Sequence, residues 1–343
     1  MRDAIAMTAL VAVCAASAQS PEAGGKAVWP LRDPTATSAL FQSIRQSDVR
    51  AVAELVARGD ADVNGRSDEG DTPLMYAAAY STAACMELLL EHRADPNARD
   101  KRGGTALMRS IRDLAKVKLL VAHGAEVDVR SDAGVTALMT AASRPGSSDV
   151  VKLLLEQKAD PRTVDRAGVP PLMYATDFGD LESVKALVAA GARIDNGRRN
   201  GVTPLFWASN GPLDVLEWLL EHDADPNVTR GNGGTGTPLM EAALFGMTAN
   251  AEALLDWGAD VNAMSARGTP LMWAAGSDRA GHDMIRLLLD RGADPNVVAT
   301  RCDLCISEPR AVNGSKDLTA LMLARQRGET EIVRMLLAAG AAR

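Results

Sequence analysis

One tetrapeptide, Thr/Pro–Pro/Ala–Leu–Met/Phe, occurs eight times at nearly regular intervals. The first seven copies start 31 to 34 residues apart, and the last interval is 50 residues. The copies start at Thr72, Thr105, Thr136, Pro170, Thr203, Thr237, Thr269 and Thr319. A period of this length indicates one supersecondary unit repeated along the chain, because each unit buries its apolar face only by stacking on its neighbours. The sequence therefore predicts a solenoid, and it favours recognition over catalysis.

Each copy predicts a pair of helices and a connecting loop. Thr72 suits the N-cap position because its hydroxyl can accept hydrogen bonds from unpaired amides, and Pro73 suits the first helical position, which needs no amide donor. A Leu-rich second helix follows over residues 83–92, and Asp95-Pro96-Asn97 ends it and opens a hairpin-like finger. In several copies glycine follows the second helix, as a left-handed C-cap requires; these are Gly124, Gly191, Gly258 and Gly292.

This unit resembles the ankyrin repeat, whose pattern is roughly G-x-T-P-L-H-x-A-A, then a Leu-rich helix and G-A-D-x-N. Residues 258–262 (Gly-Ala-Asp-Val-Asn) and 292–296 (Gly-Ala-Asp-Pro-Asn) match the entry into its finger almost letter for letter. The resemblance covers about residues 37–343. It implies an all-α solenoid of paired antiparallel helices with hairpin-like fingers, in about nine repeats including the caps.

One departure from this pattern concerns the family's tetrapeptide histidine, which ties backbone across repeats. All eight copies carry Met or Phe there: Met75, Met108, Met139, Met173, Phe206, Met240, Met272 and Met322. Apolar packing is expected to substitute for that hydrogen bond, and Met fills irregular gaps well. The seventh repeat also gains about three residues around 278–280.

The N-terminal residues differ in composition from the repeats. Residues 4–16 are small and apolar apart from Thr8, and the A-x-A sequence 16–18 follows. This pattern predicts a secretory signal peptide over 1–18, cleaved after Ala18, then a flexible linker over 19–35 and an ankyrin repeat domain over 36–343. The mature protein is expected to be periplasmic or secreted, without membrane insertion. The alternative is a cytoplasmic protein with an apolar N-terminus.

The sequence shows no catalytic or cofactor motif, so we expect no enzyme and no cofactor. The net charge of −7 argues against nucleic acid as a partner. The four histidines, His92, His123, His222 and His282, lie at helix ends or inter-helix turns of separate repeats. Three of them close a second helix, where a cation favours the negative end of the helix dipole. Residues 231–236 satisfy G-x-G-x-x-G, but they precede a tetrapeptide rather than join a strand to a long helix, which indicates a finger tip.

Cys302 and Cys305 lie in an inserted loop at about 299–316, which stretches the last interval. A closed zinc site wants four ligands, and the only other cysteine after residue 18 is Cys85. In an oxidising compartment a local disulfide would staple this loop. Two free thiols and disulfide exchange with a partner are the alternatives. The alternative function is therefore a redox-active or envelope-stress protein that uses this loop, with the repeats as scaffold.

The resemblance also implies a concave groove, lined by the positions four and eight residues after each tetrapeptide start. Seven of the chain's twelve aromatic residues fall on these positions: Tyr76, Tyr80, Tyr174, Phe178, Trp207, Phe245 and Trp273. Such rings give rigid contact area at low entropic cost, so we expect them to anchor a partner protein. The alternative is that they pack between repeats. Phe41, Trp218 and Trp257 are expected in the helix core.

The expected finger tips carry arginines on a chain that is acidic overall. Those expected to contact a partner are Arg102, Arg130, Arg166 and Arg199. They would complement an acidic partner segment, which contributes to specificity and association rate more than to affinity; the alternative is a solvated rim. The sequence thus predicts a monomeric, non-enzymatic scaffold that binds another protein through its groove and finger tips.

Overall fold

The computed structural model shows paired helices and no β-strand in the part of the chain that it describes. The described residues are 36–59, 61–178, 180–195, 197, 201–230, 236–299 and 318–342. The predicted signal peptide and linker, 1–35, lie outside them. The chain divides into two compact units, one ending at Asp132 and the other beginning at Ala133.

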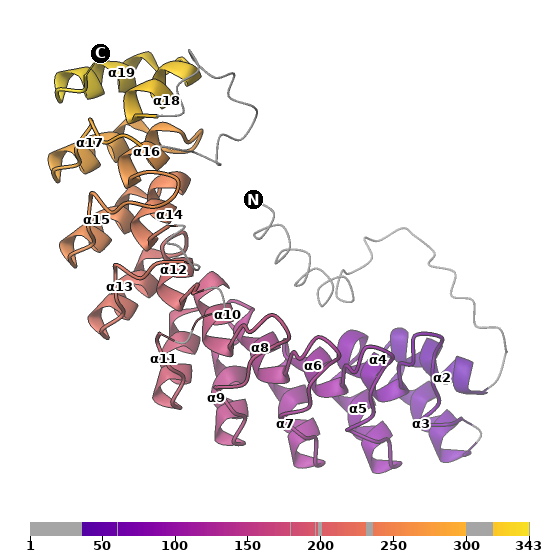
Figure 1. Cartoon of the computed structure of the whole chain (residues 1–343). Helices are drawn as coiled ribbons and strands as arrows, with labels where there is room; N and C mark the ends of the chain where they lie inside the picture. Colours follow the sequence, from indigo (N-terminus) through magenta and orange to yellow (C-terminus); the bar gives the residue numbers. More distant parts are fainter. Residues whose placement is uncertain are drawn as a thin grey trace. The chain divides into compact units, whose positions relative to one another are not determined.

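The first unit contains three helix pairs, drawn in indigo to magenta in Figure 1. They are α2 (Ala36–Arg45) with α3 (Val49–Ala57), α4 (Pro73–Tyr80) with α5 (Ala83–Glu91), and α6 (Ala106–Ser110) with α7 (Leu114–Ala122). The first helices form one layer, in which α4 contacts α2 and α6. The second helices form another layer, in which α5 contacts α3 and α7. The predicted helix-pair architecture is therefore confirmed.

The second unit repeats this arrangement in six pairs. They are α8 (Ala137–Ala142) with α9 (Ser148–Glu156), α10 (Pro171–Phe178) with α11 (Leu181–Ala189), α12 (Pro204–Ala208) with α13 (Leu213–Glu221), α14 (Pro238–Phe245) with α15 (Thr248–Asp256), α16 (Pro270–Ala275) with α17 (His282–Asp290), and α18 (Ala320–Arg327) with α19 (Thr330–Ala338). Again each first helix contacts the next first helix, and each second helix contacts the next second helix. The two layers thus continue through all six pairs.

The tetrapeptide threonine caps its helix in seven of the eight copies. Thr72, for example, accepts a hydrogen bond on its hydroxyl from the Met75 amide at 3.3 Å. The same cap occurs at Thr105, Thr136, Thr203, Thr237, Thr269 and Thr319. In the exceptional copy the Met173 amide donates instead to the backbone carbonyl of Pro170 at 3.1 Å. The predicted helix starts are therefore confirmed. In one copy a backbone carbonyl, that of Pro170, takes the place of the threonine hydroxyl as the acceptor.

The second helices end in left-handed residues, and not all of these are glycine. Gly124, Gly191, Gly258 and Gly292 have φ values of 81°, 97°, 86° and 88°, as predicted. Three other repeats place Arg93, Lys158 and Asp223 in the same conformation, with φ of 66° or 67°. A residue with a Cβ pays about 1–2 kcal/mol there. These three repeats therefore carry local strain that glycine would relieve.

An asparagine side chain connects a finger to the repeat that follows it. Asn262 Nδ2 donates to the Gly292 carbonyl at 3.0 Å, and its Oδ1 accepts from the Asp294 amide at 2.9 Å. The same two-bond bridge is made by Asn64, Asn97, Asn227 and Asn296. At Arg162 the guanidinium Nε donates to the Gly191 carbonyl at 3.0 Å. The repeats are thus held together by these polar bridges as well as by the apolar packing that the sequence predicts.

The Met and Phe side chains of the tetrapeptide lie mostly inside the stack. Those at most 2% exposed are Met75, Met139, Met173, Phe206, Met240 and Met272. Met108 is half-buried, and Met322 in the last repeat is 44% exposed. Apolar packing in place of the histidine is therefore confirmed at these six buried positions.

The inserted loop begins and ends at adjacent points of the fold. Ala299 and Leu318 form an isolated antiparallel bridge, with amide-to-carbonyl distances of 2.9 and 3.0 Å. Residues 300–317, which include Cys302 and Cys305, lie outside the described residues. Because the bridge closes the base of the insertion, the repeat register resumes at Thr319.

Replacing a buried leucine tests this packing. Leu154 in α9 is 0% exposed, so Leu154→Ala should lower the free energy of unfolding by about 2–5 kcal/mol. The neighbouring Leu153 is half-buried, and Leu153→Ala should cost about 1 kcal/mol. Urea titrations followed by circular dichroism would measure both. Equal costs for the two variants would contradict the register of α9.

Candidate protein-binding surface

Within the described residues, Tyr174, Trp273 and Arg109, each the fourth residue after a tetrapeptide start, contact the finger of their own repeat. Tyr174 Oη donates to Asp165 Oδ2 at 2.7 Å, and Asp165 Oδ1 accepts from the Val169 amide at 2.9 Å. In the seventh repeat Trp273 Nε1 donates to Ser265 Oγ at 3.4 Å. These residues position a finger over its first helix.

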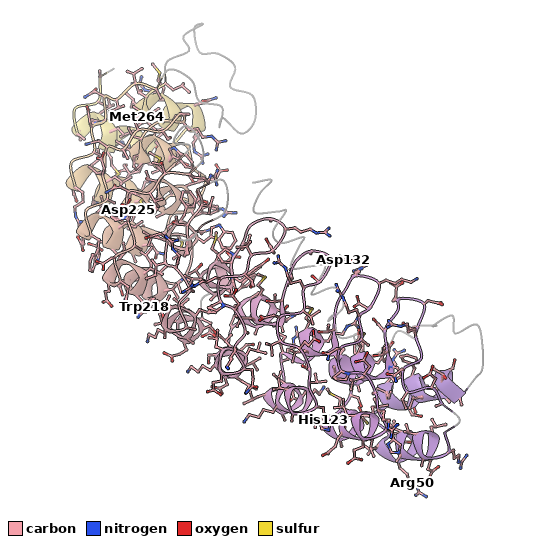
Figure 2. All side chains as sticks on the ribbon, turned by 60° about the horizontal axis from the view of Figure 1, so that its bottom comes forward. Arg50, His123, Asp132, Trp218, Asp225 and Met264 are labelled. Atoms are coloured by element: carbon pink, nitrogen blue, oxygen red, sulfur yellow. The ribbon has the colours of Figure 1, made fainter. Side chains whose placement is uncertain are left out.

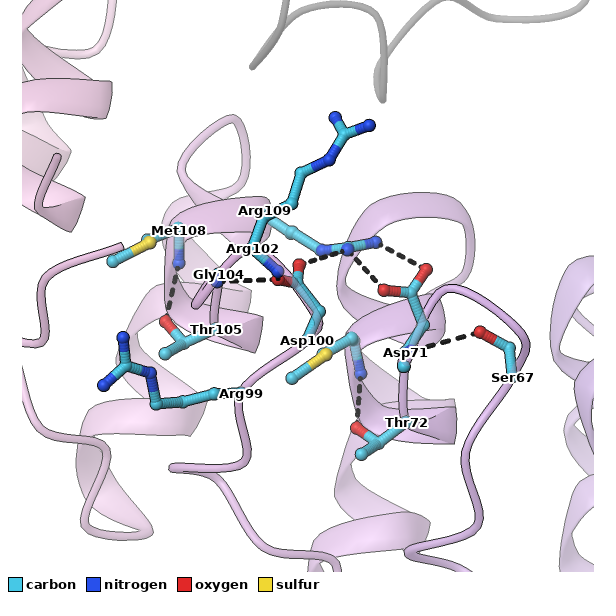
Figure 3. A network of polar contacts seen from close by, with 12 residues as sticks. Ser67, Asp71, Thr72, Arg99, Asp100, Arg102, Gly104, Thr105, Met108 and Arg109 are labelled. Carbon is cyan, nitrogen blue, oxygen red and sulfur yellow. Dashed lines mark hydrogen bonds and ion pairs between the residues drawn. The ribbon is translucent and has the colours of Figure 1, made fainter. Parts of the chain in front are cut away.

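Arg109 makes the third such contact and also joins two repeats (Figure 3). Its Nη2 donates to Asp100 Oδ2 at 2.7 Å within its own repeat. Its Nη1 donates to Asp71 Oδ2, at the end of the preceding finger, at 3.0 Å. The three side chains are only 9 to 16% exposed. The guanidinium therefore acts as a largely buried cross-link between adjacent fingers.

The charge states of this cluster follow from its contacts. Burial alone would raise the pKa of Asp100, but hydrogen bonds from Arg109 and from the Gly104 and Arg102 amides hold it below its ordinary value. Burial alone would lower the pKa of Arg109, but the charges and hydrogen bonds of Asp71 and Asp100 raise it. Both groups are therefore held in their charged forms.

Three of the seven aromatic residues expected in the groove are buried. Tyr76 is 6% exposed, Tyr174 is 4% exposed and Trp273 is 5% exposed. Tyr76 packs against Phe41 and Tyr80, with ring centroids 5.3 and 5.0 Å apart. These three rings serve the repeat stack, which is the alternative that the sequence left open.

The other four rings are accessible to different degrees. Tyr80 is 40% exposed, whereas Phe178, Trp207 and Phe245 are half-buried. Phe41 lies in the core as expected. The expectation is wrong for Trp257, which is 49% exposed because it is the C-cap residue of α15 rather than a residue of its buried side.

Arginines lie over aromatic rings in the second unit. The Arg279 guanidinium carbon is 5.0 Å from the Phe245 ring centroid. Arg230 lies over Phe206 at 5.4 Å, and Arg267 lies over Trp273 at 6.0 Å. Such pairs combine a rigid apolar face with a positive charge. We call this set, with Trp207, the arginine–ring surface of the second unit.

Glu241 lies close to this surface in α14. Burial raises the pKa of its carboxyl group, while the charges of Arg230 and Arg267 act in the opposite direction. Its half-buried side chain takes the groove position that Trp207 and Trp273 take in the neighbouring repeats. In its ionised form, this carboxylate offsets part of the positive charge of the arginine–ring surface, and burial opposes that form.

The position of Arg279 depends on the enlarged loop between α16 and α17. Ser277 Oγ accepts hydrogen bonds from the Arg279 and Ala280 amides at 3.0 and 3.3 Å. Gly246, with a φ of 71°, lets this loop approach, since a Cβ there would collide with the Arg279 carbonyl. Sequence reasoning noticed the extra residues but missed Arg279; the enlarged loop was the available signal.

The predicted finger arginines that the structure describes are exposed. Arg102, Arg130 and Arg166 have exposed side chains, and Arg102 points away from the buried cluster in Figure 3. Arg199 lies outside the described residues. The structure also shows two finger arginines that the sequence reasoning missed. Arg66 donates to the Arg99 carbonyl and Arg99 to the Arg130 carbonyl, so each guanidinium ties its finger to the next.

Other chemistry finds little support in the described part of the chain. No group of three or more His, Cys, Asp or Glu side chains there could hold a metal ion. His92, His123 and His222 cap second helices as expected, each bonding through Nδ1 to the carbonyl four residues earlier at 2.8 to 2.9 Å. Cys85 is a buried free thiol.

Residues 231–235 of the glycine-rich segment lie outside the described residues. Among the described helices, none has the length and apolar character needed to cross a bilayer.

Comparison with protein-family models identifies the class of protein. A model described as "Ankyrin repeats (3 copies)" matches residues 94–165, 138–230 and 230–299. "Ankyrin repeats (many copies)" matches 55–108, and "Ankyrin repeat" matches 316–343. The chain therefore belongs to the ankyrin repeat family. Ankyrin repeats are protein–protein interaction modules, and the family is in general non-enzymatic.

Curated relatives agree with this assignment. YahD of Escherichia coli (strain K12), named as an ankyrin repeat protein, is 31% identical over 206 residues, which are 58% of this chain and 94% of YahD. The ankyrin repeat and KH domain-containing protein mask-1 of Caenorhabditis elegans is 32% identical over 306 residues, 89% of this chain but 10% of mask-1. Palmitoyltransferase AKR1 of Lachancea kluyveri is 30% identical over 183 residues, 51% of this chain and 20% of that enzyme. The chain thus spans only a small part of the last two relatives.

Acid should weaken the Asp71–Arg109–Asp100 cluster. The folded-state pKa of Asp100 lies below its ordinary 3.8, so its ionised form contributes stability that is present above 3.8 and lost as the pH falls through the lower folded value. An Asp100→Asn variant should be less stable at neutral pH and should lose less further stability than the wild type as the pH falls below 3.8. Urea unfolding at several pH values measures this.

Asp68→Asn is the matched control, because Asp68 is an exposed finger residue. It should keep the wild-type dependence of stability on pH. Identical pH profiles for the wild type and Asp100→Asn would contradict the assigned role of the cluster.

Proposed function

We propose that this chain is a non-enzymatic, monomeric scaffold that binds another protein through its first helices and fingers. The observation that carries the proposal is the arginine–ring surface of the second unit. There, Arg230, Arg267 and Arg279 each lie within 6.0 Å of a ring centroid. Aromatic and arginine side chains dominate the energetically important centres of protein interfaces.

The partner segment that fits this surface is acidic. A guanidinium held over a ring keeps its donors directed outward and loses little entropy when a carboxylate binds. The exposed Arg166 lies in a finger of the same unit. In the first unit, Arg102 and Arg130 give exposed fingers the same charge. Trp207 and Phe245 would provide the apolar contact, and in the first unit Tyr80 would do so.

We propose further that the protein is exported. The support is the apolar stretch 4–16 followed by the A-x-A sequence 16–18. Sequencing of the N-terminus of the purified protein checks this, because cleavage after Ala18 leaves Gln19 first. An intact N-terminus on the mature protein would favour the cytoplasmic alternative.

Replacing the accessible groove residues should abolish partner capture without unfolding the chain. Residues 19–343 would be immobilised and exposed to cell-envelope extract under oxidising conditions, with bound proteins quantified by mass spectrometry. Trp207→Ala and Arg279→Glu should each reduce capture of the specific partner at least about tenfold, the loss typical of an interface hot spot. Circular dichroism should remain unchanged, since Trp207 is half-buried and Arg279 is exposed.

The matched control is Arg286→Glu, an exposed arginine on the second helix α17. It should leave capture unchanged. Equal capture by Trp207→Ala and the wild type would contradict the proposal. Trp273→Ala is not a suitable test, because its ring is buried and its loss should destabilise the fold.

A further inference from the structure

The second helices of the second unit carry an exposed aromatic and acidic patch on the layer opposite the first helices. Trp257, the C-cap residue of α15, is 49% exposed. On the adjacent helix α13, Trp218 is half-buried and stacks on His222, with ring centroids 3.8 Å apart. Figure 2 shows Trp218 at the outer edge of the chain. An indole exposed to this extent is not part of the core and is available to contact another molecule.

Acidic residues predominate in the two segments that carry these rings, and Arg291 of the next repeat pairs with two of them, Glu252 and Asp256. Residues 213–225 contain five Asp or Glu residues and no Lys or Arg, and residues 248–260 contain three and none. Glu217 and Glu221 are exposed, and neither has an ion-pair partner among the residues that the structure describes. The patch therefore combines indole rings with the carboxylates of Glu217 and Glu221, and each of these two kinds of group attracts a cation.

The neighbouring repeat shows how a guanidinium binds such a pair of carboxylates. In α15 the fifth and ninth residues are Glu252 and Asp256. Arg291, the C-cap residue of the next second helix, α17, donates to Asp256 Oδ1 at 2.7 Å and to Glu252 Oε1 at 3.3 Å. The repeat thus provides an internal example of a cation seated between these two positions.

In the preceding repeat, the fifth and ninth residues of the second helix are again acidic, but no arginine stands at the C-cap of the next second helix. Glu217 and Glu221 are the fifth and ninth residues of α13. The C-cap residue of the next second helix is Trp257, in the place that Arg291 takes in the following repeat. The helix α13 contacts α15 as α15 contacts α17 (Figure 1). At the equivalent position of the repeat, the α13 pair is therefore followed by an indole, whereas the α15 pair is followed by a guanidinium. A cation that binds this pair in the same way would therefore come from another molecule.

We propose that Glu217, Glu221 and Trp257 form a docking site for a lysine or arginine side chain in a basic segment of a partner protein. Trp218 extends the apolar contact along α13. The carboxylates argue against a lipid surface as occupant, because they repel an anionic membrane. This site lies on the second helices, whereas the proposed acidic partner segment binds the first helices and fingers. The two proposals stand independently.

The test uses residues 19–343 and a fluorescein-labelled peptide of alternating arginine and glycine, with fluorescence anisotropy at low salt. Glu217→Gln combined with Glu221→Gln, and Trp257→Ala alone, should each weaken binding at least about fivefold. Trp257→Arg should abolish binding, because it restores the internal cation seen at Arg291. Trp257 is exposed, so these variants should keep the wild-type circular dichroism spectrum.

Glu87→Gln combined with Glu91→Gln is the matched control, since these exposed residues are the fifth and ninth of α5 and have no tryptophan at the following C-cap, which is His123. This control and Trp207→Ala should leave peptide binding unchanged. The proposal is overturned if the wild type does not bind the peptide, if the control loses as much binding as the α13 variant, or if Trp257→Arg still binds. If the protein instead binds phosphatidylserine–phosphatidylcholine vesicles and this binding depends on Trp257, the proposal of a protein partner is overturned and the occupant of the site is a membrane.

Discussion

Five asparagine side chains each join a finger to the next repeat, and we infer that this bridge sets the register of the stack at those five interfaces. A single helix pair has two short helices and cannot bury its apolar side alone, so its stability comes from its neighbours. Apolar contact has no direction and would tolerate sliding. The bridge from Asn262 to the Gly292 carbonyl and the Asp294 amide has a fixed geometry. We infer that packing provides most of the free energy, and that the asparagine bridge fixes the relative position of the repeats at the five interfaces where it occurs.

The groove positions show how stacking competes with binding. Tyr174 and Trp273 lie on the side of the first helix that would face a partner, yet each is buried and donates to its own finger. The buried, charged side chain of Arg109 also donates to its own finger, at Asp100, and in addition donates to Asp71 of the preceding finger. A finger has few apolar residues of its own, so it needs these contacts to hold its position. The residues left for a partner are those that the stack does not use, such as Trp207 and Arg279.

Much of this fold could be predicted from the sequence, because its signals are local and repeated. Thr72 and Pro73 define a helix start through the chemistry of two residues, and Gly258 defines a helix end through its φ value. The burial of single rings could not be predicted in the same way. Tyr76 and Tyr80 occupy related helical positions, but only Tyr76 lies against Phe41 of the preceding repeat.

The candidate surface was the least predictable part, because it depends on loops between repeats. Arg279 reaches Phe245 only because the enlarged loop folds back over Gly246. Trp257 was expected in the core by its apolar character, although its place after the last helical residue of α15 leaves it exposed. A hydrophobic residue at a helix end follows the geometry of the cap rather than the periodicity of the helix.

Native-state hydrogen exchange in an Asn262→Ala variant tests the role of the asparagine bridge most directly. The Asp294 amide donates to Asn262, whereas the Asp260 amide donates to Asn227 one repeat earlier. If the bridge fixes each interface separately, the variant should lose protection at Asp294 while Asp260 keeps its wild-type exchange rate. Unchanged protection at Asp294, or an equal loss at both amides, would contradict this account.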